Sequence, residues 1–244
     1  DYHEIEHERG CSVYSTVMYT EFMNHKINII DTPGSDDFVG ASVAAMNGGD
    51  LALVLINAQN GVEVGTETFM RYADKFSKPV ILVANQLDTD KSNFDKLVET
   101  TKEAFSGKAV IAQYPLNEGE NFDTVIDVIK KAAYKFPAGG GGAPEILPLP
   151  ASEVDKVEEL YAELVETAAE SDEELMEKFF ENDSLTDEEM KGGLLKGIKE
   201  RGLFPIMCVS GKNGQGTQRL LEFIIETAPN PAEIGKHKVE DGEV

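Results

Sequence analysis

A short polar segment near the start of the chain has the residue types of a phosphate and metal site. Residues 26–30 (Lys-Ile-Asn-Ile-Ile) predict a short buried strand, and residues 31–34 (Asp-Thr-Pro-Gly) end it abruptly. A carboxylate such as Asp31 at the end of a strand can hold a water molecule of a bound Mg²⁺. Gly34 has no side chain, so its backbone N–H can approach a terminal phosphate. On their own, these four residues are also typical of an ordinary strand-to-helix turn.

A second polar segment follows another predicted buried strand. Residues 80–84 are all apolar, and Asn85, Gln86 and Asp88 come directly after them. The Asp88 carboxylate can accept hydrogen bonds from the N1–H and the exocyclic amino group of guanine, an edge that adenine does not present. The Asn85 side chain can tie this loop to its neighbours.

A third polar segment, Ser210-Gly211-Lys212, follows the apolar residues 204–209. A backbone N–H of Ser210 or Gly211 can meet the O6 atom of guanine. Ligands bind at the carboxyl ends of the strands in α/β sheets. Three such segments at one edge of a sheet therefore indicate a guanine-nucleotide site.

The elements that must position these segments alternate between strand and helix. This order predicts an α/β fold with a mostly parallel sheet flanked by helices. We expect strands at residues 26–30, 51–56, 80–84 and 204–209. We expect helices at residues 36–47, 64–76, 93–105 and 217–227. Residues 12–23 alternate between apolar and polar types and predict an antiparallel hairpin with the strand that begins at Lys26.

A different pattern begins near Lys108 and indicates an inserted α+β subdomain. Residues 110–114 are compatible with a strand, whereas residues 122–136 fit a helix as well as an irregular strand. The glycines at 139–142 predict a loop. Two amphipathic helices follow, at residues 152–181, with a break and a new cap expected near Ser171, and at residues 186–201, where Thr186 and Glu189 form a capping box.

Composition limits the classes of partner. The 244 residues carry a formal net charge of −23, which argues against direct contact with duplex DNA, and the acidic residues are densest between positions 153 and 189. The two cysteines are too few for a disulfide scaffold. The longest apolar run, residues 51–56, is too short to cross a bilayer, and no signal peptide is visible. We therefore expect a cytoplasmic protein that does not contact the membrane.

Taken together, the motifs resemble those of the translational GTPases, most closely the bacterial elongation factor G family. Residues 8–10 (Glu-Arg-Gly) and 31–34 resemble its switch I and switch II motifs, and residues 85–88 and 210–211 resemble its base-recognition motifs. Residues 168–178 and 185–191 resemble the helical G′ subdomain that this family inserts between its last two base-recognition motifs. The resemblance covers nearly the whole chain.

The resemblance implies a P-loop NTPase-type G domain in a monomeric, ribosome-dependent GTP hydrolase that acts in translocation. Its first part would be residues 1–107, the G′-like insertion residues 108–202, and its last strand and helix residues 203–231, with a tail or linker at 232–244. GTP or GDP and Mg²⁺ would be the cofactors, and the ribosome the partner, including a stalk protein on the acidic helices. The implied nucleotide contacts are Asp31, Gly34, Asn85, Gln86, Asp88, Ser210, Gly211 and Lys212, and the implied metal ligands are Ser12 and Asp31.

Several positions depart from the family pattern. The chain contains no Gly-x-x-x-x-Gly-Lys-Ser/Thr phosphate loop, which implies a loop upstream of Asp1 in a longer protein that continues past Val244, and weak nucleotide binding by the fragment. Ser12 replaces the family's Thr, and Gln86 replaces its Lys.

The departure at Ser35 bears on catalysis. The family has His directly after Asp-Thr-Pro-Gly, where it positions the attacking water, beside the residue that corresponds to Gly34. A serine is a poor base, and losing a positioned acid-base group costs about 10²–10⁴ in rate, so we expect a divergent paralogue with slow hydrolysis. The alternatives are a nucleotide-gated ribosome-binding protein without significant GTPase activity, a ribosome protection protein, and a site whose Asp88 no longer selects guanine.

Overall fold

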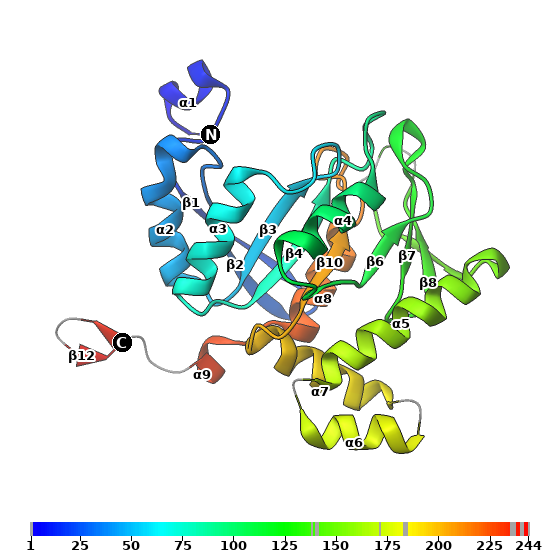
Figure 1. Cartoon of the computed structure of the whole chain (residues 1–244). Coiled ribbons are helices and arrows are strands. Elements are labelled where there is room, and N and C mark those ends of the chain that lie inside the picture. The colour runs from blue at the N-terminus through cyan, green and yellow to red at the C-terminus, as the bar shows by residue number, and fades with distance from the viewer. Residues whose placement is uncertain are drawn as a thin grey trace.

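A four-stranded parallel sheet forms the centre of the molecule (Figure 1). Its strand order is β3 (Ala52–Asn57), β4 (Val80–Asn85), β10 (Phe204–Cys208) and β5 (Ala109–Ile111). All pairs are parallel, and all five residues of β10 are buried. The structure is a computed structural model that describes every residue except 1, 138, 140–141, 171, 183–184, 235–237, 240–241 and 244.

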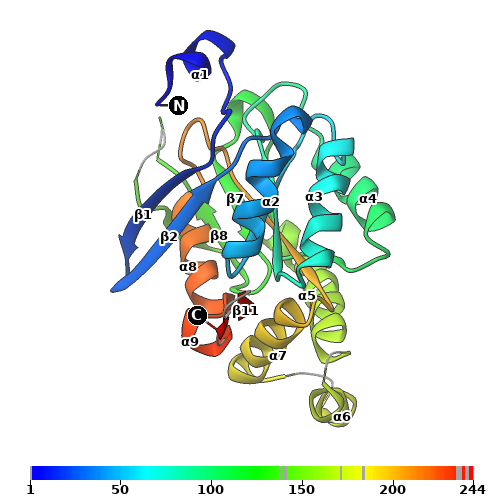
Figure 2. The same ribbon diagram turned by 90° about the vertical axis from the view of Figure 1, so that its left-hand side faces the viewer.

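Helices cover both faces of this sheet, as the sequence predicts. The helices α2 (Val39–Gly48), α3 (Val64–Lys75) and α4 (Phe94–Ala104) lie on one side, and α8 (Thr217–Thr227) lies on the other (Figure 2). Along β4, Leu82 belongs to the first hydrophobic cluster, whereas Ile81 belongs to the second. The expected cap of α4 is confirmed, because Asn93 accepts a hydrogen bond from the Lys96 N–H (2.9 Å).

An antiparallel sheet packs beside the parallel one. It consists of β6 (Gln113–Pro115), β7 (Thr124–Asp127), β8 (Ala132–Lys135) and β9 (Glu145–Pro148), in that order. The ambiguous residues 122–136 therefore form a hairpin rather than a helix, in which Ile126 pairs with Ala133. The strand β5 belongs to the parallel sheet, and the first strand of the antiparallel sheet begins at Gln113.

Three helices complete the inserted region, and the first two of them are acidic. These are α5 (Val154–Ala169), α6 (Glu173–Asn182) and α7 (Asp187–Lys199), and α5 and α7 pack on the second face of the parallel sheet. The predicted capping box is confirmed, because Thr186 Oγ1 accepts from the Glu189 N–H while Glu189 accepts from the Thr186 N–H. The expected cap at Ser171 and the glycines at 140–141 lie outside the described residues.

The predicted hairpin stands apart from the parallel sheet. It pairs β1 (Thr16–Phe22) with β2 (His25–Asp31) around Met23 and Asn24, whose positive φ values (47° and 60°) suit a tight hairpin turn. The prediction that residues 26–30 form a buried strand is wrong, because Ile30 is 36% exposed and every other residue of β2 is at best half-buried. The reason is the sheet topology: within the described residues, β2 is hydrogen-bonded to β1 alone.

A buried ionic network joins α8 to the antiparallel sheet. Arg219 Nε lies 2.8 Å from Asp127 Oδ2, and both side chains are at most 1% exposed. The same carboxylate oxygen accepts from Gln113 Nε2 (3.0 Å), and Gln113 Oε1 accepts from the Cys208 N–H (3.2 Å). Burial alone would lower the pKa of Arg219, but the carboxylates of Asp127 and Glu226 outweigh burial and raise it.

Short elements lie near the two ends of the chain. The helix α1 (Glu4–Arg9) precedes the hairpin, and α9 (Pro231–Ile234) and the strands β11 (Lys238–Val239) and β12 (Gly242–Glu243) follow α8. The rest of the expected tail lies outside the described residues. Among the helices that the structure describes, none combines the length and the apolar character needed to cross a membrane.

Candidate nucleotide site

Two of the three predicted loops lie side by side at the carboxyl edge of the parallel sheet. The strands β4 and β10 are neighbours, and the Val209 N–H donates to the Ala84 carbonyl (2.9 Å). Immediately beyond, the Asn85 Oδ1 atom accepts from the Gly211 N–H (2.9 Å) and the Gln86 N–H (2.8 Å). A Cβ atom at position 211 would lie 3.4 Å from Asn85 Oδ1, so glycine permits this close approach.

A second hydrogen bond crosses between the same two loops. The Asn213 Nδ2 atom donates to the Asp88 Oδ2 atom (3.2 Å), and both residues are half-buried. Asn213 was not predicted as a site residue, because it lies beyond the short Ser-Gly-Lys motif that ends at position 212. Its position five residues after the end of β10, in a loop that must return to a helix, is the signal that could have identified it.

The loop that carries Ser210 is closed on itself. The Ser210 N–H donates to the Gln215 carbonyl (2.9 Å), and the Ser210 side chain is fully buried. Gly216 ends the loop with a φ of 80°, and a Cβ there would lie 2.3 Å from the Cys208 carbonyl oxygen, so only glycine fits. The Gln215 side chain donates to the Phe122 carbonyl (2.8 Å). The loop is thus fixed by both the parallel sheet and the inserted region.

Gln86 and Lys212 lie on the exposed rim of these loops. Gln86 has a φ of 65°, and its Oε1 atom accepts from Asn57 Nδ2 (2.9 Å) at the end of β3. This contact turns the Gln86 side chain toward β3 and the hairpin beyond it.

The first predicted loop lies across a cleft from β3. Asp31 is the last residue of β2, paired with Thr16, and Pro33 is buried with its carbonyl accepting from Ser42 Oγ (2.8 Å). Ser35 precedes a 3₁₀ turn (Asp36–Phe38), and its carbonyl accepts from the Phe38 N–H (3.0 Å).

Gly34, which precedes Ser35, has open space around it. Its φ is outside the positive range, and a Cβ placed on it would meet no atom within 4 Å. Neither backbone conformation nor packing inside the chain therefore requires a glycine at this position.

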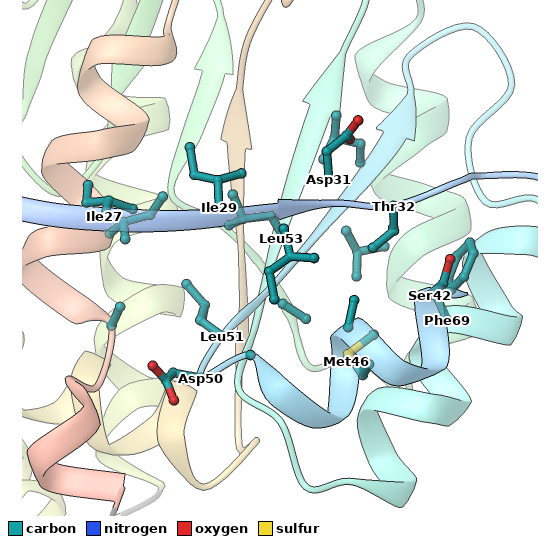
Figure 3. Close-up of a pocket in the computed structure, with 18 of the residues that line it drawn as sticks. Ile27, Ile29, Asp31, Thr32, Ser42, Met46, Asp50, Leu51, Leu53 and Phe69 are labelled. Atoms are coloured by element: carbon teal, nitrogen blue, oxygen red, sulfur yellow. The ribbon is translucent and has the colours of Figure 1, made fainter. Parts of the chain in front are cut away.

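The cleft separates β2 from β3 and encloses about 1840 Å³ (Figure 3). Apolar side chains line it, with Ile27 and Ile29 on the hairpin side and Leu53 on β3. Asp31 lies at one end of the cleft, and Asp50, which precedes β3, lies at the other. The volume exceeds the 300–1,000 Å³ of an ordinary small-molecule pocket.

Part of β3 is exposed at the cleft. Leu53 and Leu55 alternate with the buried residues of β3 and are 38% and 57% exposed. The central strands of parallel sheets are normally covered on both faces. The face of β3 that carries these two leucines is therefore incompletely covered by residues of the described chain.

A buried glutamate organises the segment around Ser12. Glu6 is 1% exposed, and its carboxylate accepts four backbone hydrogen bonds, from Val13 (2.9 Å), Tyr14 (3.1 Å), Tyr2 (2.9 Å) and His3 (3.2 Å). The bonds from Val13 and Tyr14 contribute most to lowering its pKa to about 2.

The helix α1, which carries Glu6, also contacts the segment after Ser35. The guanidinium of Arg9 lies 5.5 Å from the centre of the Phe38 ring. Glu6 was not predicted as a buried residue, because an acidic residue in a polar stretch is usually solvated. The spacing of His3 and Glu6, which form a capping box, is the signal that could have identified it.

Ser12 and Asp31 offer oxygen ligands at the same end of the hairpin. Ser12 lies in the connection that leads into β1, whose first residue, Thr16, pairs with Asp31. Mg²⁺ is commonly bound through one or two protein oxygens, with waters and phosphates completing its octahedron. These donors therefore fit Mg²⁺ in kind. A group of three or more His, Cys, Asp or Glu side chains that could hold a metal does not occur in the part of the chain that the structure describes.

Two comparisons relate the chain to known proteins. The family model described as the elongation factor Tu GTP binding domain matches residues 1–230. A crystal structure of a protein from Thermus thermophilus is similar at a TM-score of 0.88 and 30% sequence identity, over 97% of this chain and 36% of that one. The chain thus spans about a third of that relative.

We expect the substitution Glu6→Gln to loosen the segment that leads to Ser12. It replaces a charged acceptor of backbone hydrogen bonds by a neutral amide, which is a weaker acceptor. Amide hydrogen exchange at Val13 and Tyr14 should become faster. Because the pKa of Glu6 is lowered from 4.5 to about 2, its contribution is complete above about pH 4.5 and is lost as the pH falls through about 2.

The matched control is Glu4→Gln, which changes an exposed acid of the same helix. Exchange at Val13 and Tyr14 should not respond to it. Equal acceleration by the two substitutions would show that the charge of the helix, rather than the buried carboxylate, orders the segment.

Proposed function

Because the chain belongs to the elongation factor Tu GTP binding domain family, we propose that it is the nucleotide-binding domain of a ribosome-dependent translational GTPase similar to elongation factor G. The observation that carries the proposal is the pair of hydrogen bonds that joins the loops of Asn85 and Gly211, and of Asp88 and Asn213. The two loops that the resemblance assigns to base recognition are held together at one sheet edge by hydrogen bonds of the chain itself.

In this proposal the base lies against these two loops. The Asp88 carboxylate accepts from N1–H and the exocyclic amino group of guanine, and a backbone N–H of Ser210 or Gly211 donates to O6. Asn85 holds the loops in register, and Gln86 and Lys212 line the rim.

The phosphates lie toward the hairpin. Gly34, whose surroundings leave room for a ligand, offers its N–H to the terminal phosphate, and Ser12 and Asp31 hold Mg²⁺ directly or through water. Bound Mg²⁺ would neutralise phosphate charge and orient the terminal phosphate. GTP or GDP with Mg²⁺ is thus the proposed ligand of the whole protein.

The remaining phosphate contacts come from a segment that fills the cleft between β2 and β3. Among the residues that the structure describes, no strand pairs with the cleft-facing edge of β2 or β3, and apolar side chains line the cleft. An extended strand followed by a helix therefore suits it. Such a strand, running parallel to β3, ends beside Gly34 and can there supply the phosphate loop that residues 1–244 do not contain. We assign this segment to a part of the whole protein outside these residues.

Hydrolysis by the whole protein is proposed to be slow. Ser35 occupies the position of the family's histidine, and its neutral, short hydroxyl is poorly suited to orient and polarise the attacking water. This observation also favours a second candidate function, a nucleotide-gated ribosome-binding protein whose hydrolytic step is vestigial. A ribosome protection protein is a third candidate, which the substantial helical insertion disfavours.

The inserted region is proposed as the G′-like subdomain, with the divisions at residues 1–107, 108–202, 203–231 and 232–244. Its acidic helices α5 and α6 are proposed to dock a ribosomal stalk protein. Phe180 on α6 is 74% exposed and can supply an apolar contact there. The parent protein is proposed to be a cytoplasmic monomer that binds the ribosome and neither duplex DNA nor membrane.

The base assignment predicts the effect of Asp88→Asn in the whole protein. In Asp88→Asn, an N–H donor replaces one of the two acceptor oxygens of the carboxylate. The affinity of the whole protein should therefore fall about 10²-fold for GDP and rise for xanthosine diphosphate. Equilibrium binding of the two nucleotides measures the change. Asp90→Asn, the same substitution at an exposed neighbour, should leave both affinities unchanged. A variant at 88 that gains nothing for xanthosine diphosphate would place the base elsewhere.

The catalytic assignment predicts the effect of Ser35→His. Restoring a positioned imidazole should raise ribosome-stimulated GTP hydrolysis by the whole protein about 10²–10⁴-fold. Single-turnover phosphate release measures it, with Ser152→His at an exposed position as the control. Unchanged hydrolysis in Ser35→His would contradict the assignment, and so would wild-type turnover within about tenfold of an ordinary elongation factor.

The cleft assignment predicts the effect of Leu55→Asn. Although Leu55 is 57% exposed here, the substitution should destabilise the whole protein by about 2 kcal/mol, because the added strand and helix would bury an unpartnered amide. Thermal unfolding measures it. Ile146→Asn on β9, at a residue that is 64% exposed, should cost under about 0.5 kcal/mol. Equal, small losses at the two sites would mean that the cleft stays open.

A further inference from the structure

We propose that Asn213 is a positioning residue for the base: its side-chain amide fixes the plane of the Asp88 carboxylate and thereby strengthens selection of guanine. The inference rests on the proposed guanine site and assigns a role to a residue outside the motifs that predicted that site. The hydrogen bond from Asn213 Nδ2 to Asp88 Oδ2 (3.2 Å) carries it.

The need for such a residue follows from the torsions of aspartate. The last torsion of its side chain joins a tetrahedral carbon to a planar carboxylate and has a broad, shallow energy profile. Reading two adjacent N–H groups of guanine requires both oxygens of Asp88 to lie in the plane of the base. A fixed external donor removes this freedom before the base arrives, which lowers the entropy lost on binding.

An amide suits this task better than a charged donor. Asn213 is neutral, so Asp88 keeps the full negative charge with which it accepts the guanine N–H groups. Each carboxylate oxygen can accept more than one hydrogen bond, so the bond to Asn213 leaves acceptor capacity on both oxygens. The nitrogen rather than the oxygen of the amide faces Asp88, because two oxygens would repel.

Asn213 is itself held by its loop. Its backbone N–H donates to the buried Ser210 Oγ (3.3 Å), and Gly214 follows it with a φ of 71°. The closing bond between Ser210 and Gln215 fixes both ends of the segment. The loop therefore holds the Asn213 amide in a fixed position beside Asp88.

The test compares GDP with inosine diphosphate, which lacks the exocyclic amino group, on the whole protein. In Asn213→Ala, the affinity for GDP should fall about tenfold, as expected for losing a hydrogen bond to a charged group. The affinity for inosine diphosphate should fall less, because a single bond to N1–H depends less on the carboxylate plane. The preference for GDP over inosine diphosphate should therefore shrink severalfold. Asn213→Asp, which has the same shape but places two carboxylates in contact, should weaken GDP binding further.

The matched control is Asn60→Ala. Asn60 Nδ2 donates to Glu63 Oε1 (3.1 Å) on an exposed turn, so the substitution removes a comparable bond outside the site and should change neither affinity. Thermal unfolding is recorded for every variant. A GDP preference that is unchanged in Asn213→Ala would overturn the inference. Equal weakening of both nucleotides with a lowered melting temperature would also overturn it, since the role would then be structural. Wild-type protein that does not prefer GDP to ADP would instead refute the proposed function.

Discussion

The insertion of β10 between β4 and β5 is the constraint on which the rest of the structure depends. The register of β10 against β4 places Cys208 beside Ala84. The loops that follow β4 and β10 therefore begin at the same level of the sheet edge. The chain leaves the parallel sheet after β5 and returns to it only at Phe204, after about 90 residues of inserted structure. Closing so long a connection costs conformational entropy that grows only slowly with length. The fully buried residues of β10 offset that cost through contacts on both faces of the sheet.

The inserted region stabilises the pairing of β10 with β4 and β5. Gln113 lies at its beginning and bonds both the backbone of Cys208 in β10 and the carboxylate of Asp127 in β7. Asp127 in turn holds Arg219 of α8, the helix that follows the loop of Ser210 and Gly211. Desolvating the two charges cancels much of their attraction, so the pair adds little net stability, but leaving either partner alone would be costly. The network therefore selects one arrangement of β10, β7 and α8.

The elements that the sequence predicted well are those whose signals are local. The Asn93 and Thr186 caps and the apolar runs of β3, β4 and β10 need no knowledge of distant contacts. Residues 122–136 could not be assigned, because their pairing partners decide between helix and strand. The burial of β2 was predicted wrongly, since the isoleucine pattern cannot reveal whether a neighbouring strand is present. In the candidate site, residues 85–88 and 210–212 could be proposed from their types, whereas Glu6 and Asn213 act through hydrogen bonds that only the folded chain defines.

The two halves of the candidate site differ in how complete they are, and this difference has a physical consequence. The base half is rigid, with cross-loop hydrogen bonds and a buried network behind it. The phosphate half consists of a half-exposed hairpin, an open glycine and a cleft. A nucleotide carries its negative charge on the phosphates, and a chain with a formal net charge of −23 repels it unless fixed donors and cations act locally. In the proposed function, residues 1–244 contain the groups that discriminate between bases, and the donors that complete the phosphate half supply most of the binding free energy. Selectivity and affinity for the nucleotide would then be encoded in separable parts of the protein.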